Sequence, residues 1–438
     1  MQLFAAMRIG IVAYWFNRGQ AVVARQIRAT LDDLGHETHV LARPTRKTNI
    51  KPGWVDTEGV WAQARVTAAS DYLIPGDEYL TWADAAGLDL VLFDQNYQFD
   101  EIARLRESGV RTAGRFVWEH FSAEHVEPAG RAFDRIYSLT ACERERYAEM
   151  GIDTPRVRWG CYPELVEMAK ERELDASGRT SGQSVPDQGG ARSPAPPQGE
   201  ARGGGRDPGA AVPEAGPHMA DGPKARSTYA QLSEAEHSAG GISYLFPGGF
   251  MSKRKPLAAT IAAFRGTSDP RLKLVLKAQV ERQRKQVERM IRGGSRFGRR
   301  DRRIEVITDD LPTDEYMRMF AAADVCLAPS RWEGLGLHLF EATALGVPIL
   351  TNDNPPMNEV VIDGVNGLLV PGLPDGAAPR SGIPAFAPDV PALTAAIERI
   401  SDPGLRSELA AGARRRREEL SWDNTTADLE ALIAEVAR

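Results

Sequence analysis

The sequence predicts an α/β protein with two domains, each built around a parallel β-sheet. Its 438 residues are enough for two or three domains with cores of their own. Short apolar runs alternate with amphipathic helical patterns in both halves, and such strand–helix–strand units are typical of parallel sheets. Between the halves, residues 171–240 become rich in Gly, Pro, Ala and Ser, with almost no large apolar residues from about Asp175 onward. Because this stretch cannot bury enough surface to offset its ordering entropy, we predict a disordered insertion between the domains.

The composition excludes several classes of protein. A net charge of −6, from 54 Lys and Arg against 60 Asp and Glu, implies no general attraction to nucleic acid. Three scattered cysteines, Cys142, Cys161 and Cys326, indicate reduced thiols and neither a disulfide framework nor a zinc site. No run reaches the roughly 18 apolar residues that span a bilayer. We therefore expect a cytoplasmic protein, with Met7 as an alternative start and residues 1–6 as an unstructured leader.

The first domain is predicted for residues 7–170 and opens with a strand–helix–strand unit. Its strands are expected at Arg8–Tyr14 and Glu37–Ala42, with the helix at Gln20–Leu34 between them. The first loop contains one glycine, Gly19, and no G-x-G-x-x-G pattern, so a dinucleotide site is not supported. Further strands are predicted at Leu88–Phe93, Thr112–Trp118, Arg135–Leu139 and Arg156–Gly160, and helices at Phe99–Ser108 and Cys142–Met150.

Glu119 and His120 directly follow one of these predicted strands, Thr112–Trp118. They therefore stand at the carboxyl edge, where open α/β sheets bind ligands. A histidine in this place is either a structural hydrogen-bonding residue or a site residue, and the pattern leaves both interpretations open. We keep His120 as a candidate site residue.

The second domain is predicted for residues 241–420. It begins with a strand at Gly241–Phe246, then a glycine turn, a basic loop and a helix that ends near Phe264. Later elements are strands at Lys273–Leu276 and Glu305–Ile307, helices at Thr313–Ala323, Val390–Ile400 and Leu405–Leu420, and a Pro/Gly-rich insertion at Gly372–Pro388. Residues 271–303 carry thirteen Lys and Arg against three Asp and Glu. The basic part, Arg282–Arg303, is either a solvated face or a surface that contacts an anionic membrane or acceptor.

The most informative stretch is Ala321–Thr351, which predicts a strand, a loop, a helix and a second strand. The strands are Val325–Ala328 and Val347–Thr351, and the helix is Leu337–Leu345, with Gly346 at its end. The loop holds the glycines Gly334 and Gly336.

Two carboxylates belong to this unit, Glu333 in the loop and Glu341 in the helix. The amides of Gly334, Leu335, Gly336 and Leu337 would be free at a helix N-terminus, where the dipole favours an anion such as phosphate. A carboxylate one turn further on can accept two hydrogen bonds from a vicinal diol such as a ribose. The alternative is that either glutamate is only a dipole partner or half of a capping box.

The stretch PSRWEGLGLHLFEATALGVPIL resembles the E-x7-E signature of family-four retaining glycosyltransferases, with Glu333 and Glu341 at that spacing. The resemblance implies a GT-B fold of two Rossmann-like domains facing a cleft, and a last helix, residues 421–438, that crosses back to the first domain. It implies transfer of a sugar from a nucleotide-diphosphate donor to an acceptor hydroxyl with retention, without metal or cofactor. Glu341 would hold the ribose and Glu333 the donor sugar, while His120 and Gly19 would face the cleft.

The loop PGGFMSKRKP resembles the phosphate-contacting loop of the same family, with Gly249 as its glycine and Lys255 as its lysine. Phe250 occupies the position where the family has an arginine. Lys253, Arg254 or Arg331 would then supply the missing cation. The open alternatives are a nucleotide-sugar epimerase or phosphorylase of the same fold, and a binding subunit with impaired catalysis. The donor base, the sugar, the acceptor and the oligomeric state are not predicted.

Overall fold

The structure is a computed structural model that describes residues 6–46, 52–181, 240–249, 253–278, 284–294, 298–379 and 381–438. Most of the predicted insertion, residues 182–239, lies outside the described residues, and so does Phe250. Within the described part, no helix is both long and apolar enough to cross a membrane.

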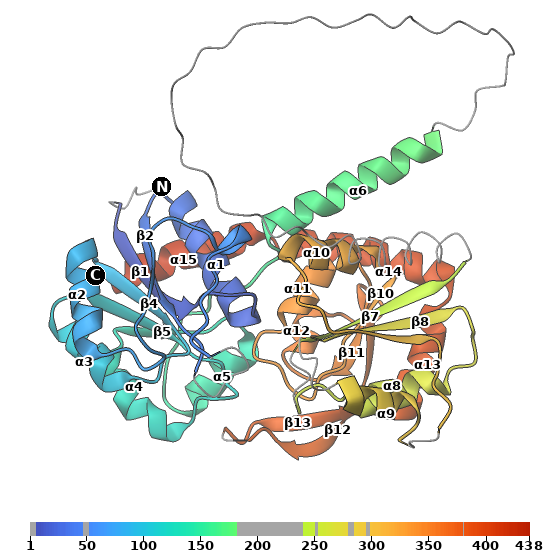
Figure 1. Ribbon diagram of the computed structural model, residues 1–438. Helices are drawn as coiled ribbons and strands as arrows, with labels where there is room; N and C mark the ends of the chain where they lie inside the picture. Colours follow the sequence, from blue (N-terminus) through green and yellow to red (C-terminus); the bar gives the residue numbers. More distant parts are fainter. Residues whose placement is uncertain are drawn as a thin grey trace, which may run out of the picture.

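The first domain is built on a six-stranded parallel sheet with strand order β3-β2-β1-β4-β5-β6 (Figure 1). Its strands are β1 (Arg8–Tyr14), β2 (Glu37–Arg43), β3 (Val66–Ala68), β4 (Leu90–Asp94), β5 (Arg111–Arg115) and β6 (Arg135–Tyr137). Its helices are α1 (Gly19–Asp33), α2 (Gly76–Ala86), α3 (Phe99–Glu107), α4 (Val126–Ala132) and α5 (Ala141–Glu149). Side chains of β1 enter two different core clusters, Ile9 and Ile11 in one and Val12 in the other. Both faces of this sheet are therefore covered, as is usual for parallel sheets.

The second domain has a seven-stranded sheet with order β13-β12-β11-β10-β7-β8-β9, parallel except for the β12–β13 pair. Its strands are β7 (Ile242–Gly249), β8 (Leu272–Ala278), β9 (Ile304–Ile307), β10 (Val325–Leu327), β11 (Ile349–Asp353), β12 (Gly367–Ala377) and β13 (Pro384–Pro388). Its helices are α8 (Leu257–Gly266), α9 (Arg284–Ile291), α10 (Thr313–Ala322), α11 (Leu337–Ala344), α12 (Met357–Val360), α13 (Val390–Ile400) and α14 (Pro403–Glu419). Asp389 and Asp402 cap α13 and α14, each accepting a backbone N–H at 2.8 Å.

Three sequence predictions differ from the structure. Arg156–Gly160 is not a strand and forms only isolated bridges at its ends, because the chain leaves the sheet there and the Cys161 N–H donates to Leu420 O at 2.7 Å. Residues 171–181 are helical, since α6 (Pro163–Ser181) continues past residue 170 through the good helix formers Glu171–Leu174. Gly372–Pro388 belongs to the hairpin of β12 and β13, whose place at the sheet edge tolerates prolines.

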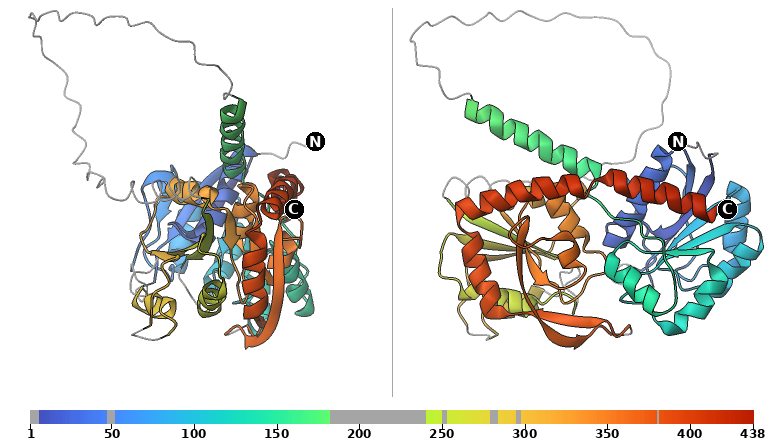
Figure 2. Two further views of the ribbon diagram at one scale, coloured as in Figure 1. Left: turned by 90° about the vertical axis from the view of Figure 1, so that its right-hand side faces the viewer. Right: turned by 180° about the vertical axis from the view of Figure 1, so that it is seen from behind.

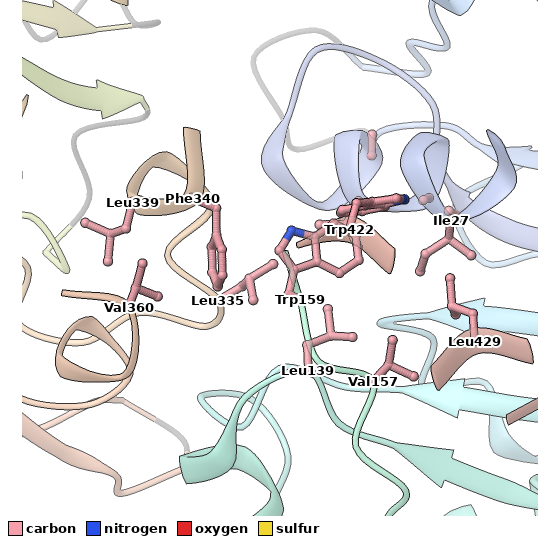
Figure 3. Packing of buried hydrophobic residues seen from close by; sticks show 14 of the residues in the cluster. Ile27, Leu139, Val157, Trp159, Leu335, Leu339, Phe340, Val360, Trp422 and Leu429 are labelled. Atoms are coloured by element: carbon pink, nitrogen blue, oxygen red, sulfur yellow. The ribbon is translucent and has the colours of Figure 1, made fainter. Parts of the chain in front are cut away.

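A shared apolar core and the last helix join the two domains. Leu335, Leu339 and Phe340 of the second domain and Trp159 of the first belong to one buried cluster (Figure 3). After α14, the chain continues as α15 (Trp422–Val436) along the back of the first domain (Figure 2). There the Trp422 indole N–H donates to Thr30 Oγ1 at 3.1 Å. The cleft between the two domains is therefore closed at its base by packed side chains.

Candidate active site

The unit of β10, α11 and β11 positions the predicted site loop at the carboxyl edge of the second sheet. β10 and β11 are parallel neighbours, with Cys326 opposite Ile349. Gly336 caps α11 with φ at +76° and Gly346 follows the helix with φ at +71°, backbone conformations that strain other residues. A Cβ on Gly334 would lie 2.1 Å from Val117 Cγ1 of the first domain. The glycines thus allow both the helix start and the close approach of the two domains.

Glu333 is the centre of a buried charged cluster. Its Oε1 accepts hydrogen bonds from Lys255 Nζ at 2.7 Å and from Ser330 Oγ at 2.8 Å. Arg254 Nη1 lies 3.4 Å from Glu333 Oε2. Burial by itself would raise the pKa of this carboxyl, but Arg254 and Lys255 hold it well below its ordinary value. Glu333 is therefore an ionised carboxylate that already has two cations beside it.

Arg254 also connects the two domains, because its Nη1 lies 3.3 Å from Glu119 Oε1. Three residues were candidates for the cation missing at residue 250. Two of them, Arg254 and Lys253, line the same cavity as Lys255. Arg331 instead forms an ion pair with Asp375 at 2.7 Å. The sequence analysis did not include Glu119 in the site, although its position next to His120 at a strand end was a usable signal.

A cavity of about 560 Å³ lies between the domains and collects nine of the ten predicted site residues. These nine are Gly19, His120, Gly249, Lys255, Glu333, Gly334, Leu335, Gly336 and Leu337. His120 is exposed on the first-domain side, with its Nε2 3.7 Å from Glu119 Oε1. The fold thus brings residues from both domains to one place, as a site in the cleft requires.

Glu341, the tenth, lines an adjoining cavity of about 350 Å³ together with Gly19, Gly249 and Leu337. It is 7% exposed, and burial raises the pKa of its carboxyl to about 7. The same cavity is lined by Lys277, whose Nζ donates to Asp309 O at 2.6 Å and which is held beside the end of β8. Glu341 lies deep inside α11, so it is not one of the acidic residues that pair with a helix N-terminus.

His338 lies where the two cavities meet and was missed by the sequence analysis. It lines both cavities, and its Nε2 is buried without a hydrogen-bond partner in the described part of the chain. Burial and the nearby Lys255 lower the pKa of this imidazole to about 3, although Glu333 opposes them. It is therefore neutral at ordinary pH. His338 directly follows Leu337, the last of the four residues whose amides were predicted to face an anion. This position was the signal in the sequence that could have identified it.

Comparison with known proteins agrees with this geometry. Residues 242–380 match the model of the family described as Glycosyl transferases group 1. D-inositol 3-phosphate glycosyltransferase of Acidothermus cellulolyticus is 33% identical over 120 residues, which cover 27% of this chain and 23% of that protein. The Salinispora tropica protein of the same name is 36% identical over 121 residues, covering 28% and 21%. The chain thus matches only between a fifth and a quarter of these relatives' length.

The fold as a whole is shared with solved structures. A sucrose-phosphate synthase from Thermosynechococcus elongatus has a TM-score of 0.65 at 16% identity, covering 98% of this chain and 99% of that one. Anabaena Alr3699/HepE, solved in complex with UDP-glucose, has a TM-score of 0.61 at 13% identity, with coverage of 98% and 99%. Residues 242–380 of the second domain are therefore similar to the Glycosyl transferases group 1 family, and the whole chain has the GT-B fold of two facing Rossmann-like domains.

Proposed function

We propose that this chain is a retaining glycosyltransferase of the hexosyltransferase type, which moves a sugar from a nucleotide-diphosphate sugar to an acceptor hydroxyl. One observation carries the proposal: buried Lys255 and Glu333 lie with partly exposed Arg254 at the start of α11, in a cavity that adjoins buried Glu341. Phosphate, sugar and ribose partners are thereby available in two adjoining cavities that share lining residues. The UDP-glucose bound by the HepE protein supports a nucleotide sugar as the donor class.

The donor diphosphate is assigned to Lys255, Arg254 and the amides at the start of α11. Cations and a helix N-terminus together stabilise a diphosphate and the charge that develops on it as it departs. Arg254 takes the role of the arginine that the family resemblance places at residue 250. The ribose is assigned to Glu341, and the base to the part of the second cavity near Lys277 and Leu311.

In the proposed reaction, the bond between the anomeric carbon and the diphosphate oxygen breaks, and the electron pair stays on that oxygen. The acceptor oxygen bonds to the anomeric carbon on the face that the diphosphate leaves, and the acceptor proton passes to the departing diphosphate. Glu333 orients the donor sugar, and His120 completes the sugar site from the first domain. This course needs no carboxylate nucleophile, and we expect no metal or other cofactor.

No specific observation favours the epimerase, the phosphorylase or the impaired binding subunit over transfer to an acceptor. The binding-subunit alternative depended on the loss of the arginine at residue 250. Arg254 offers a guanidinium in the same cavity, so it removes the reason for that alternative.

Contact with an anionic membrane through Arg282–Arg303 is a separate proposal. α9 buries Val287 and Ile291, while its basic residues stay exposed. Part of the charge is balanced, since Arg300 Nε lies 3.1 Å from Glu288 Oε2. Sedimentation with vesicles of anionic lipid, beside vesicles of neutral lipid, tests it. Equal recovery with both vesicle types would remove the proposal.

The proposed function is tested in two steps. Calorimetric titration with UDP, GDP and ADP should identify one nucleoside diphosphate that binds, with a weaker response to the other two. Incubation of the corresponding nucleotide sugars with acceptor alcohols should then give a glycoside whose anomeric configuration, read by NMR coupling constants, matches the donor. An inverted product would reject retention, and absence of binding to all three nucleotides would reject the donor class.

A further inference from the structure

The first-domain wall of the larger cavity carries positive charge that the proposed donor chemistry does not use. Within its described lining, Lys and Arg contribute five side chains, against the two carboxylates Glu119 and Glu333. Lys255 and Arg254, on the second-domain side, already have these carboxylates as partners. The cations on the other side are Arg18 and Arg115.

The strand register brings charged and aromatic residues of neighbouring strands close to these two arginines. Tyr14 is opposite Arg43 at the ends of β1 and β2, and Asp94 is opposite Arg115 at the ends of β4 and β5. These four strands are neighbours in the order β2-β1-β4-β5, so the four residues form one row along the carboxyl edge. Arg18 lies in the loop after β1, where it is the N-cap residue of α1. This edge is where open parallel sheets bind their ligands.

The charge in this row is not balanced. Arg115 Nη1 donates to Asp94 Oδ1 at 2.5 Å, and both residues are more than nine-tenths buried. The positive charges of Arg43 and Arg18 act on the same Asp94 carboxylate. Buried Glu143 also acts on Arg115, so three guanidinium groups, those of Arg18, Arg43 and Arg115, stand against the two carboxylates of Asp94 and Glu143. In addition, Arg115 Nε is buried without a hydrogen-bond partner in the described part of the chain.

Aromatic rings lie against two of these guanidinium groups, those of Arg43 and Arg18. The Arg43 guanidinium lies 3.9 Å from the centre of the Tyr72 ring, and its Nε donates to Tyr72 O at 2.9 Å. The Arg18 guanidinium lies 5.3 Å from the centre of the Tyr14 ring. Stacked guanidinium groups are pre-organised for bidentate contact with phosphate or carboxylate, so little entropy is lost when an anion binds.

We propose that the first-domain side of the cavity binds the acceptor through an anionic group, a phosphate or a carboxylate, held by Arg18 and Arg115. This inference rests on the proposed function, because it names the acceptor class for the same reaction. An acceptor anchored there presents a hydroxyl toward the donor sugar at Glu333 from the opposite wall. Arg18 is also close enough to Arg254 for their charges to act on each other, so the experiment must separate acceptor binding from donor binding.

The experiment fills the donor site first and then measures binding of anions. With the protein saturated by the nucleoside diphosphate that binds it, glucose 6-phosphate, glucuronic acid, glucose and inorganic phosphate are each titrated by calorimetry. We expect binding of at least one anionic sugar and none of glucose. Arg18→Gln should weaken that binding about ten- to a hundredfold, as loss of a charge-assisted hydrogen bond does. Arg18→Lys keeps the positive charge but loses the paired N–H donors of the guanidinium group. Its affinity for the anionic sugar should therefore lie between those of Arg18→Gln and the wild type.

Arg131→Gln is the matched control, because Arg131 is an exposed arginine of the first domain that pairs with Glu127 at 3.0 Å outside the cavity. It should leave every affinity unchanged, and Arg18→Gln should leave the affinity for the nucleoside diphosphate unchanged. Preference for the phosphate or for the carboxylate then identifies the anionic group.

Four results would overturn the inference. Equal binding of glucose and its anionic derivatives, or equal anion affinity in wild type and Arg18→Gln, would reject the acceptor class and leave the proposed function standing. Loss of nucleoside-diphosphate affinity in Arg18→Gln would assign Arg18 to the donor. If the wild type binds no nucleoside diphosphate, the proposed function fails, and the inference fails with it.

Discussion

Glu333 and Glu341 belong to one short unit of the chain, yet their surroundings differ in charge. Both are buried, at 4% and 7% exposure. Glu333 stands between Lys255 and Arg254, which keep it ionised. Burial alone acts on Glu341 and raises the pKa of its carboxyl to about 7. The spacing of the two glutamates in the sequence thus brings both carboxylates near a ligand. Which of them is ionised before a ligand binds depends on side chains from distant segments of the chain.

The largest effect should come from removing the cation that Glu333 depends on. Lys255→Ala leaves a buried carboxylate with one partner fewer, and such a loss typically costs about 3 kcal/mol or more in the free energy of unfolding. It also removes charge from beside the departing diphosphate, so turnover should fall about a hundredfold or more. Steady-state kinetics and thermal unfolding measure both effects.

Lys253→Ala is the control for this substitution, because Lys253 is exposed and lines the same cavity. It should change turnover and stability only slightly. Equal turnover in wild type and Lys255→Ala would take Lys255 out of the site and leave Glu333 without its proposed function.

The next effect separates the two carboxylates by the kinetic constant that changes. Glu333→Ala removes a group that contacts the sugar while its shape and charge change, so kcat should fall about ten- to a hundredfold. Affinity for the free nucleoside diphosphate should not weaken, because Lys255 and Arg254 lose a competing anion. Titration of the nucleoside diphosphate beside kinetics measures this. Weaker nucleotide binding in Glu333→Ala would contradict the assignment to the sugar.

Glu341→Ala should show the opposite pattern. The ribose is present in ground and transition states alike, so loss of its acceptor should raise KM and weaken free nucleotide binding about tenfold to a hundredfold, with kcat little changed. The same two measurements apply to this variant. If both glutamate variants bind nucleotide as the wild type does, the ribose assignment of Glu341 fails.

The smallest effect is a pH dependence of nucleotide binding. The folded pKa of Glu341 is raised to about 7, so its carboxyl is mostly protonated at pH 6 and mostly ionised at pH 8. Ribose hydroxyls donate to the ionised form, so affinity should be present at pH 8 and decline roughly tenfold as the pH falls to 6. The free nucleoside is the ligand to titrate, because it carries no phosphate that ionises in this range.

Glu341→Gln should make the nucleoside affinity independent of pH over the same interval. Because the folded protein holds this proton more tightly than the unfolded chain, ionisation of Glu341 should also lower the free energy of unfolding as the pH rises from about 4.5 to 7. Glu341→Gln should lose that part of the slope. A wild-type affinity that is flat from pH 6 to pH 8 would show that Glu341 is ionised throughout.

The sequence by itself determined the elements whose signals are local. The first strand, Arg8–Tyr14, and the helix Val390–Ile400 were predicted with the bounds that the structure has. The unit around Glu333 and Glu341 was predicted because buried strands, helix periodicity and the glycines Gly336 and Gly346 act within a few residues of each other. These signals predicted two mainly parallel sheets and ten candidate site residues, of which nine line one cavity in the structure and the tenth lines the adjoining one.

Only the tertiary structure decided which side chains meet. Lys255 reaches Glu333 across 78 positions of the chain, and Arg254 reaches Glu119 across 135. Glu359 accepts hydrogen bonds from the backbone of Ala141 and Cys142 in the other domain. No local sequence pattern encodes such pairs, because they depend on how the two domains pack against each other. The charge state of each carboxylate follows from those distant neighbours and from burial, and therefore belongs to the fold and not to the motif.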